Sequence, residues 1–534
     1  MSEAAQKEQS ALTDSGEIAD QSAAQNGQEI EVKFRTDALG LKRVMDAPVF
    51  GSATIMKSQS LRSVYFDTPD GDVRKNGCVL RLRKNGRALG SLCLKWTDQT
   101  SEGPFTRGEI EVPCREQMPN LSLFDAATQS RLDEILGGRP LEPQFETQIK
   151  RRIVLLQSGN SLIEVALDEG VIVAGAERLP VAEVELELKS GSETDLYDLA
   201  MKLVEETALS LDFVSKSDKG YRCASREAAS AIKAKSIGLK PDATLDEAVA
   251  AVLANTLAQF VANWAALRES DGPESVHQMR VALRRMRSGL AMFRRALPSV
   301  EIDELRGEAK RIASALGAAR ECDVFQENAE SGPLASLERT EGVTELLSAI
   351  EARRVEAYRN ARSLIEASAT SLFVLKVQGF LARRAWRGSL PSADLASLTA
   401  PARQFAKEAL DRLRARALKR GRKLMKISDS DRHELRIALK NLRYCAEFFG
   451  TLFDRRRQQR DFLGGVAALQ DLLGTHNDVV STSKLLDQLP TAKDPAATRV
   501  SGYLLGWYAR GIPIADRQLS QVWKKFKAMD LFWT

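Results

Sequence analysis

Two eleven-residue segments place a histidine and three basic side chains at the same helical spacing. They are HQMRVALRRMR at 277–287 and HELRIALKNLR at 433–443. At about 100° per residue, the four groups of each segment fall on one stripe of a helix. Clustered cations repel one another, so we expect each stripe to face concentrated negative charge such as phosphate. The candidate anion-binding residues are His277, Arg280, Arg284 and Arg287, followed by His433, Arg436, Lys440 and Arg443.

The two stripes belong to a duplicated helical unit. All four positions recur at an offset of 156 residues, and LGAARECDV at 316–324 is followed by LGTHNDVV at 473–480. A solvated basic helix is the default explanation for such runs, including the basic run at 415–426. Repetition of four positions in register argues against that default for the stripes. No third zinc ligand accompanies the histidines, so we predict no metal in this half.

A second set of ionic residues alternates with apolar ones, as in a β-strand. EIEVKF at 29–34 puts Glu29, Glu31 and Lys33 on one face. Turned inward, such faces would line a tunnel in which carboxylates hold a hard cation and basic groups hold phosphates. The alternative is a charged face in contact with solvent. The other ionic positions are Arg81, Arg83, Lys95, Glu109, Glu111, Glu164, Asp168, Glu183, Glu185 and Glu187, with either Arg151 or Lys150 and Arg152.

The elements that must carry these residues differ between the two halves. Eight strands are predicted at 29–34, 64–68, 79–84, 89–96, 107–113, 149–156, 162–170 and 181–189. Turn-rich loops join most of them, which indicates an antiparallel barrel or a tightly curved sheet. Helices predicted at 37–47, 121–136 and 193–209 would cover its apolar face. Residues 1–28 resemble a disordered tail, 224–242 a linker, and the pattern from 244 onward is helical.

Composition sets the class of protein. The chain has 534 residues, a net charge of +5, 43% hydrophobic and 28% charged residues, which is typical of a soluble protein. Its six cysteines form no CxxC pair, which favours reduced thiols in a cytoplasmic protein. Residues 248–267 carry no charge, but their alanines and polar side chains favour a buried bundle helix, so no membrane segment is predicted.

The strand region resembles the CYTH family, the triphosphate tunnel enzymes, over about residues 28–223. EIEVK is similar to its ExExK strand, and YFDTPD, RLR, LK, the paired glutamates, ALDEG, ELEL and SKSDKGY follow in the family's order. The resemblance implies an antiparallel β tunnel that binds a triphosphate and Mg²⁺ or Mn²⁺. It also implies Glu29, Glu31, Glu185 and Glu187 as metal ligands; Lys33, Arg81, Arg83, Glu185 and Glu187 as catalytic; and Lys95, Arg151, Lys216 and Arg62 as substrate-binding.

The helical half resembles the CHAD family, the conserved-histidine α-helical domain, over about residues 240–525. HELRIALKNLRYCAEFF is similar to the family's second motif, whereas RECD has Glu321 in place of the usual aspartate of the first LG motif. The resemblance implies two four-helix bundles around a basic channel that binds inorganic polyphosphate.

We therefore expect a multidomain α and β protein. It comprises a tail (1–28), an eight-stranded β tunnel with flanking helices (29–223), a linker (224–242) and a duplicated helical domain (243–525). The expected function is metal-dependent hydrolysis of inorganic triphosphate coupled to polyphosphate binding, in the cytoplasm, with polyphosphate granules as one site.

Three alternatives remain open. The first is a non-enzymatic polyphosphate-binding or granule protein. The second is a tunnel enzyme acting on an organic triphosphate, such as thiamine triphosphate, an RNA 5′-triphosphate or ATP for cyclisation. The third is a nucleic-acid binder, which the scarcity of exposed aromatic residues disfavours. The oligomeric state is left open.

Overall fold

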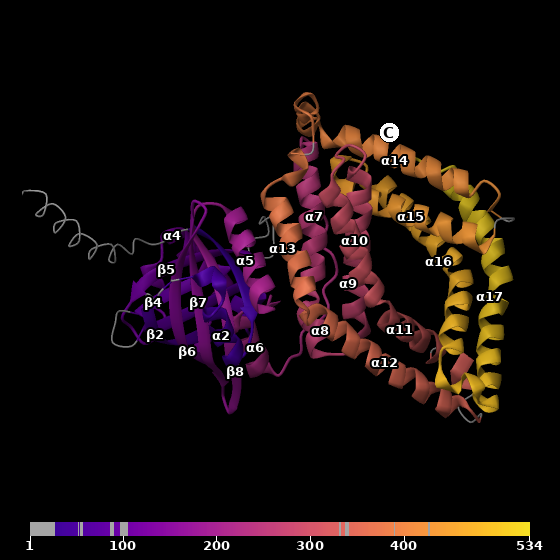
Figure 1. Ribbon diagram of the computed structural model, residues 1–534. Coiled ribbons are helices and arrows are strands. Elements are labelled where there is room, and N and C mark those ends of the chain that lie inside the picture. The colour runs from indigo at the N-terminus through magenta and orange to yellow at the C-terminus, as the bar shows by residue number, and fades with distance from the viewer. Residues whose placement is uncertain are drawn as a thin grey trace, which may run out of the picture. The chain divides into compact units, whose positions relative to one another are not determined.

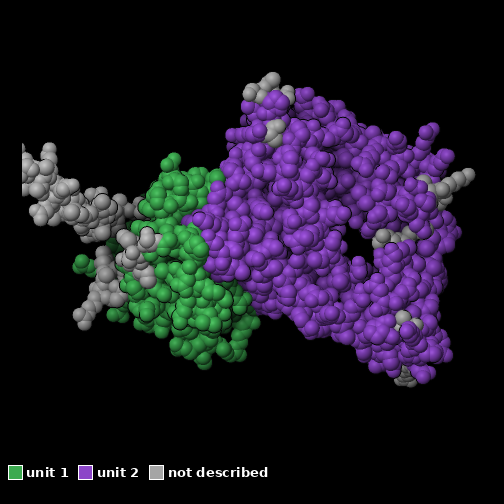
Figure 2. Space-filling model, viewed as in Figure 1, with its two compact units in different colours: residues 1–101, 105–196, 214–227 green, residues 102–104, 197–213, 228–534 purple. Residues whose placement is uncertain are grey.

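The computed structural model describes residues 27–51, 53, 57–85, 90–96, 105–330, 333–336, 341–388, 390–424 and 428–534. They form two compact units, coloured separately in Figure 2. Unit 1 takes in the described residues of 27–96, 105–196 and 214–227, and unit 2 those of 197–213 and 228–534. The predicted tail at 1–28 falls outside the described residues except for Gly27 and Gln28.

Unit 1 is an antiparallel barrel of eight strands (Figure 1). Their order is β5-β4-β3-β2-β6-β7-β8-β1, and β1 also pairs with β5, which closes the sheet. The predicted eight-stranded tunnel is thereby confirmed. The strands are β1 (Gly27–Arg35), β2 (Lys57–Asp67), β3 (Cys78–Asn85), β4 (Gly90–Trp96), β5 (Thr106–Cys114), β6 (Glu142–Ser158), β7 (Ser161–Ala174) and β8 (Glu177–Ser190).

Closure of the barrel separates the two faces of every strand. Apolar side chains on the outer face of β3, β4 and β5 pack under α4 (Ala126–Leu136), with Leu82, Leu92 and Leu132 fully or almost fully buried. Successive side chains of a strand point to opposite faces of the sheet. Because the apolar side chains face outward under α4, the alternate, ionic side chains point into the barrel. The other helices of this part of the chain are α2 (Ala38–Met45), α3 (Asp72–Lys75), α5 (Glu193–Thr207) and α6 (Lys216–Ser225).

One end of the barrel interior is filled by α6. Its Tyr221 packs edge-on against Phe145 of β6, and Phe145 stacks on Tyr65 of β2. A Cβ at Gly220 would lie 2.0 Å from the Phe145 ring, so only glycine allows the helix to approach this closely. The interior is therefore a chamber that α6 limits at one end.

Unit 2 is helical, as predicted. Pro273 occupies the first turn of α9, where its missing N–H costs no hydrogen bond. The helices are α7 (Leu245–Ala262), α8 (Trp264–Glu269), α9 (Pro273–Phe293), α10 (Val300–Ala315), α11 (Gly317–Glu330), α12 (Val343–Glu366), α13 (Ser368–Ala382), α14 (Ala402–Arg420), α15 (Asp429–Phe449), α16 (Arg456–Asp487) and α17 (Pro495–Lys527).

The helices of unit 2 surround an opening that is visible in Figure 2. Helices α7, α9, α10 and α13 pack together, as do α14 to α17. An apolar cluster including Phe325, Leu346 and Leu504 joins α11 and α12 to the adjoining ends of α16 and α17. Helices α9 and α15, which carry the two stripes, contact each other.

Two segments bear on the predicted domain boundary and on the prediction of no membrane segment. Residues 197–213 precede the predicted linker but pack with unit 2, where Asp212 accepts a hydrogen bond from Arg268 at 3.1 Å and the Leu211 backbone N–H donates to Ser371 at 3.0 Å. The run Leu245–Glu269 is long and apolar enough to cross a membrane by length and composition, and 72% of its most apolar window is buried inside the protein. It packs as a core element of unit 2.

Candidate active site and anion groove

Three carboxylates face one another across three strands of the barrel. Glu31 of β1 lies opposite Glu187 of β8, and Glu187 lies opposite Glu164 of β7. Like charges directly opposite in a sheet are destabilising. Lys189 offsets part of this repulsion, with its Nζ 2.6 Å from Glu187 and 3.8 Å from Glu164. We call Glu31, Glu187 and Glu164 the carboxylate row.

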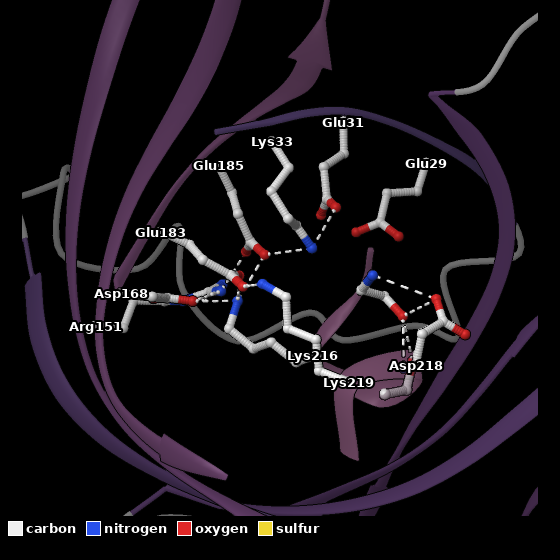
Figure 3. A network of polar contacts seen from close by, with 12 residues as sticks. Glu29, Glu31, Lys33, Arg151, Asp168, Glu183, Glu185, Lys216, Asp218 and Lys219 are labelled. Atoms are coloured by element: carbon white, nitrogen blue, oxygen red, sulfur yellow. Dashed lines mark hydrogen bonds and ion pairs between the residues drawn. The ribbon is translucent and has the colours of Figure 1, made fainter. Parts of the chain in front are cut away.

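The next positions along the same strands form a buried ionic network (Figure 3). Lys33 Nζ lies 2.9 Å from Glu185 and 3.2 Å from Glu31. Glu185 also accepts from Lys216 at 2.7 Å and from Arg151 at 2.5 Å. Burial opposes its ionisation, but Lys216, Lys33 and Arg151 hold the pKa of Glu185 well below its usual range. Its oxygens are thus occupied by three cations of the protein.

Asp168 forms ion pairs with two of those three cations, Arg151 and Lys216. It accepts from both Nε and Nη2 of Arg151, at 2.7 and 2.6 Å, and lies 2.8 Å from Lys216 Nζ. Its side chain is fully buried. The sequence left open whether Arg151, or Lys150 with Arg152, points into the barrel. In the structure Arg151 lines the chamber, and Lys150 and Arg152 occupy the alternate positions of β6, on its other face.

Helix α6 delivers Lys216 to the chamber. The sequence SKSD begins this helix with a capping box, in which Ser215 and Asp218 satisfy each other's backbone N–H groups. Lys216, at the first helical position, then reaches Glu185, Asp168 and Glu183 within 2.8 Å. The SKSDKGY motif therefore combines a helix cap, a chamber lysine and the glycine that permits packing on Phe145.

The opposite wall of the chamber carries cations with weaker compensation. Lys95 pairs with Glu29 at 2.5 Å, whereas the nearest carboxylates to Arg81, Glu109 and Glu111, are 3.6 and 3.8 Å away. Arg83 makes a 3.4 Å hydrogen bond to the Ser63 hydroxyl. Burial and the neighbouring guanidinium groups of Arg81 and Arg151 lower the pKa of Arg83. This wall is suited to an anion with several oxygens.

The chamber has a volume of about 340 Å³ and a mostly ionic lining. Nine lysine or arginine and seven glutamate side chains line it, which leaves two more positive than negative charges when all are ionised. Tyr65 is the sole aromatic side chain among the described residues of the lining. Sequence analysis missed Lys57, Arg107 and Lys189. Lys189 continues the period-two pattern of β8, whereas Lys57 lies in the polar first half of β2.

One predicted substrate-binding residue lies elsewhere. Arg62 has the opposite strand parity from Gln59 and Tyr65, which line the chamber. Its side chain is 62% exposed and pairs with Glu146 at 2.6 Å. The structure therefore does not bring Arg62 to the chamber, whereas it does bring Glu29, Glu31, Lys33, Arg81, Arg83, Lys95, Arg151, Glu185, Glu187 and Lys216 there.

In unit 2, both basic stripes contribute to one groove of about 890 Å³. Arg284 of α9 lies near Lys440 and Arg436 of α15, and burial together with Arg284 lowers the pKa of Arg436. Burial, together with Arg284, Arg436 and Arg280, lowers the pKa of Lys440 to about 7. The described lining includes six of the eight predicted residues, His277, Arg280, Arg284, Arg436, Lys440 and Arg443.

Arg287 and His433 are absent from the described lining of the groove. His433 belongs to the second turn of α15 and is exposed, so the groove begins one turn further along at Arg436. The structure adds Arg285, Arg320, Lys233 and Lys235 to the lining. Arg285 lies off the stripe, about 100° around the helix from Arg284, and its guanidinium donates to Gln259 and Asn255.

The duplicated motifs contact each other in the same way in both copies. Arg280 donates to the carbonyl of Ala313, and Arg436 donates to the carbonyl of Gln470. A Cβ on the glycine of each LG motif would lie close to the same guanidinium, 3.2 Å from Arg280 for Gly317 and 3.6 Å from Arg436 for Gly474. The glycine thus leaves room for Arg280 in the first copy, whereas in the second copy a Cβ would make only an ordinary contact with Arg436.

The fold and its two sites define the class of the protein, an ionic antiparallel barrel joined to a duplicated basic helical unit. Residues 27–221 match the family model of the CYTH domain, and residues 251–487 match that of the CHAD domain. These two matches identify a CYTH domain followed by a CHAD domain in the same chain.

Individual proteins resemble different parts of the chain. An inorganic triphosphatase of Haemophilus influenzae is 32% identical over 208 residues, which are 38% of this chain and 56% of that protein. An uncharacterized protein of Mycobacterium tuberculosis is 26% identical over 501 residues, 89% of this chain and 90% of that protein. The crystal structure of the CHAD domain from the plant Ricinus communis covers 56% of this chain and 98% of its own, with 27% identity and a TM-score of 0.48.

Proposed function

We propose that the barrel hydrolyses inorganic triphosphate with the help of a divalent metal ion, and that the helical unit binds inorganic polyphosphate. The observation that carries the proposal is the division of the chamber between a carboxylate row and a wall of arginines. Such an arrangement suits a polyanion together with a cation. The CYTH match and the similarity to an inorganic triphosphatase support the same activity.

The carboxylate row fits a hard divalent cation. Glu31, Glu187 and Glu164 meet in register, and among the described residues their ion-pair partners are Lys189 and Lys33. Carboxylate oxygens are the ligands that Mg²⁺ and Mn²⁺ prefer. Of the four predicted ligands, Glu31 and Glu187 lie in this row and Glu29 lies beside it, whereas Glu185 is held by three cations. We assign Glu31, Glu187 and Glu164, with Glu29, as the residues that would hold the metal.

A second acidic group fits such a metal less well. The side chains of Cys93, Glu109 and Glu111 could place three ligand atoms around one ion. Arg81 and Lys95 already lie beside these carboxylates. Burial raises the pKa of the Cys93 thiol to about 12, which keeps it protonated. We therefore assign no metal there.

The remaining chamber residues would orient the substrate. Arg81, Arg83 and Arg151 present guanidinium groups that would neutralise phosphoryl oxygens as charge develops in the transition state. Lys33 stays protonated, since Glu185 and Glu31 raise its pKa despite the effect of burial, and would add a further positive charge. A glutamate of β8 would position the attacking water. A bound Mg²⁺ or Mn²⁺ would supply further neutralisation of the phosphates.

The lining favours an inorganic substrate over an organic triphosphate. Recognition of a base or a thiazole would call for an aromatic or apolar surface. Tyr65 is the one aromatic residue among the described lining residues, and its ring is already stacked on Phe145 with centroids 4.4 Å apart. A compact polyanion matches the remaining lining.

The groove would bind polyphosphate through charge. Cations from both stripes converge there, and the described wall also includes Arg285, Arg320 and two lysines. A polyanion would release counterions from its own chain on binding, which gives affinity that falls with salt. We place the protein in the cytoplasm, at polyphosphate granules, which is compatible with its six free cysteines.

A substrate panel tests the enzymatic part. Phosphate release by the full-length protein would be measured with triphosphate, ATP, thiamine triphosphate and long polyphosphate, with Mg²⁺, Mn²⁺ or a chelator. We expect triphosphate to be the best substrate and the chelator to stop the reaction. Arg83→Ala should lower turnover about a hundredfold, whereas its neighbour Lys84→Ala, on the outer face of β3, should not. Metal-independent turnover, or a preference for an organic triphosphate, would refute the proposal.

A further inference from the structure

Three arginines line a pocket on helices α9, α14 and α15 that lies outside the groove. This arginine pocket has a volume of about 160 Å³ and contains Arg295, Arg412 and Arg416. Its floor includes Ser288 and Asn441, which share a 2.9 Å hydrogen bond, and the fully buried Phe448. Among the described residues, none of the three arginines has an ion pair with a carboxylate. No described carboxylate therefore offsets their mutual repulsion through an ion pair.

A second hollow adjoins the arginine pocket at Arg416. This α14 hollow is lined by Arg416, Lys419, Arg420, Arg422, Lys423 and Asp431. Arg420 is neutralised by Glu434 at 3.0 Å, and Asp431 is engaged by Ser428 in the cap of α15. For Lys419, Arg422 and Lys423, which are exposed, no carboxylate partner occurs among the described residues. Together the two hollows make a continuous basic surface along α14.

Helix stability explains only part of this surface. Lys419 and Arg420 lie in the last turn of α14, where positive charge interacts favourably with the helix dipole. Arg416 and Arg412 lie one and two turns earlier, respectively, beyond the reach of that effect. Arg295 comes from another segment, after the end of α9. The convergence of these three side chains therefore requires another explanation.

The α14 surface and the groove lie on different faces of α15. Asn441 and Cys445, which line the arginine pocket, are about 140° and 180° around the helix from Arg436. Arg436 and Lys440 line the groove, whose described lining shares no residue with the arginine pocket. A ligand in the groove does not reach the arginine pocket through α15, so the two are separate sites.

We propose that the arginine pocket and the α14 hollow form a second binding surface for inorganic polyphosphate, which rests on the proposed function of the helical unit. A pocket of this size accommodates one or two phosphoryl groups between guanidiniums, with the rest of the chain following the α14 hollow. The described residues of α14 include no exposed large apolar side chain. The surface therefore lacks the stacking platforms of single-strand nucleic-acid sites and the apolar anchors of membrane-binding helices.

Titration of the full-length protein with long polyphosphate, followed by calorimetry at several salt concentrations, tests this proposal. The groove is first weakened by Arg280→Ala with Arg436→Ala, and residual binding is expected. Adding Arg412→Ala and Arg416→Ala should lower that residual affinity at least tenfold and reduce its salt slope by about one unit per arginine. Lys310→Ala with Arg359→Ala is the charge-matched control, because both are exposed and lack a carboxylate partner among the described residues; it should leave the residual binding unchanged.

A second readout does not depend on affinity. Phenylglyoxal modification of Arg412 and Arg416, followed by mass spectrometry, should be slowed by polyphosphate in the groove-weakened protein. The second surface is refuted if the groove-weakened protein loses all polyphosphate binding. It is also refuted if adding Arg412→Ala and Arg416→Ala does not change the residual binding. Either outcome leaves the proposed role of the groove unaffected. Single-stranded DNA or phosphatidylglycerol vesicles that protect Arg412 better than polyphosphate at equal phosphate concentration also overturn it. A wild-type protein that binds no polyphosphate refutes both this inference and the proposed function of the helical unit.

Discussion

Arg284 Nε donates a 2.6 Å hydrogen bond to the phenolic oxygen of Tyr444, and this contact links the first basic stripe to the second. The two residues come from α9 and α15, 160 positions apart in the chain. Tyr444 is almost completely buried. The contact holds a cation of the first copy beside Lys440 and Arg436 of the second, which turns two separate stripes into one anion groove.

Removing the phenolic oxygen should weaken polyphosphate binding without unfolding the protein. Tyr444→Phe keeps the ring but deletes the partner of Arg284, and a hydrogen bond to a charged group contributes about 1.5 kcal/mol or more. We expect the affinity for long polyphosphate, measured by calorimetry, to fall about tenfold with little change in melting temperature. Arg284→Ala should cost more because it also removes the charge. Equal affinity of Tyr444→Phe and wild type would refute the positioning role of Tyr444.

The two LG glycines offer a matched pair of substitutions. Alanine at Gly317 would crowd Arg280, at 3.2 Å, whereas alanine at Gly474 would meet Arg436 at an ordinary 3.6 Å contact. Gly474 lies inside α16, where alanine is favoured over glycine by roughly 0.5–1 kcal/mol, whereas Gly317 is the first residue of α11. Gly317→Ala should therefore weaken polyphosphate binding several-fold, and Gly474→Ala should leave it near wild type while raising the melting temperature. A binding titration in which Gly474→Ala weakens polyphosphate binding more than Gly317→Ala would contradict this account of the LG motif.

The carboxylate row predicts a distinct thermal response to metal. Without metal, Glu187→Gln removes a repelling charge opposite Glu31 and Glu164, so its melting temperature should equal or exceed that of wild type. Excess Mg²⁺ or Mn²⁺ should raise the melting temperature of wild type, because a ligand that binds only the folded state stabilises it. The variant should lose that increase together with triphosphate hydrolysis.

Glu169→Gln is the control for this experiment. Glu169 is exposed on β7, the strand that carries Glu164, but at the opposite parity. The Glu169→Gln protein should respond to metal as wild type does. A metal-induced increase that survives in Glu187→Gln would place the cation elsewhere in the chamber.

The alternation of ionic and apolar residues predicted most of the ionic positions that line the barrel, but it left open whether their face turns inward or contacts solvent, and the resemblance to the CYTH family favoured the tunnel. Period-two patterning identifies both faces of a strand, and in a closed barrel the helix-covered apolar face forces the other face inward. Lys57 could not be found in this way, since the first half of β2 has no apolar alternation. Arg62 was predicted from the resemblance, and its strand parity places it outside.

For the helical half, the stripes predicted the groove but not its limits. A helical stripe shows which side chains share a face, but it does not show how much of that face another helix covers. His433 is therefore exposed although it lies on the same stripe as Arg436. The stripe pattern could not identify Arg285, because the buried amide of Gln259 and the half-buried amide of Asn255, both from a different helix, hold its guanidinium. Convergence of the two copies through Tyr444 depends on tertiary packing.

Lys440 should make polyphosphate binding depend on pH in a range where most lysines do not titrate. Burial and the neighbouring Arg284, Arg436 and Arg280 lower its pKa to about 7, with Asp478 opposing the shift. Between pH 7.5 and 9 the lysine of the free protein is therefore mostly neutral. A bound polyanion favours the charged form, so binding must take up a proton and the affinity must fall as pH rises.

The expected slope is up to about tenfold per pH unit, since each pKa unit corresponds to 1.36 kcal/mol. His277 does not contribute in this range, because burial and Arg320 lower its pKa below its usual value of 6.5. Lys440→Arg keeps the positive charge but does not titrate, so it should flatten the pH dependence and bind more tightly than wild type at pH 9. Calorimetry in two buffers of different ionisation enthalpy would measure the proton uptake directly. Equal proton uptake by wild type and Lys440→Arg would assign the pH dependence to the phosphates of the ligand and exclude Lys440 as its source.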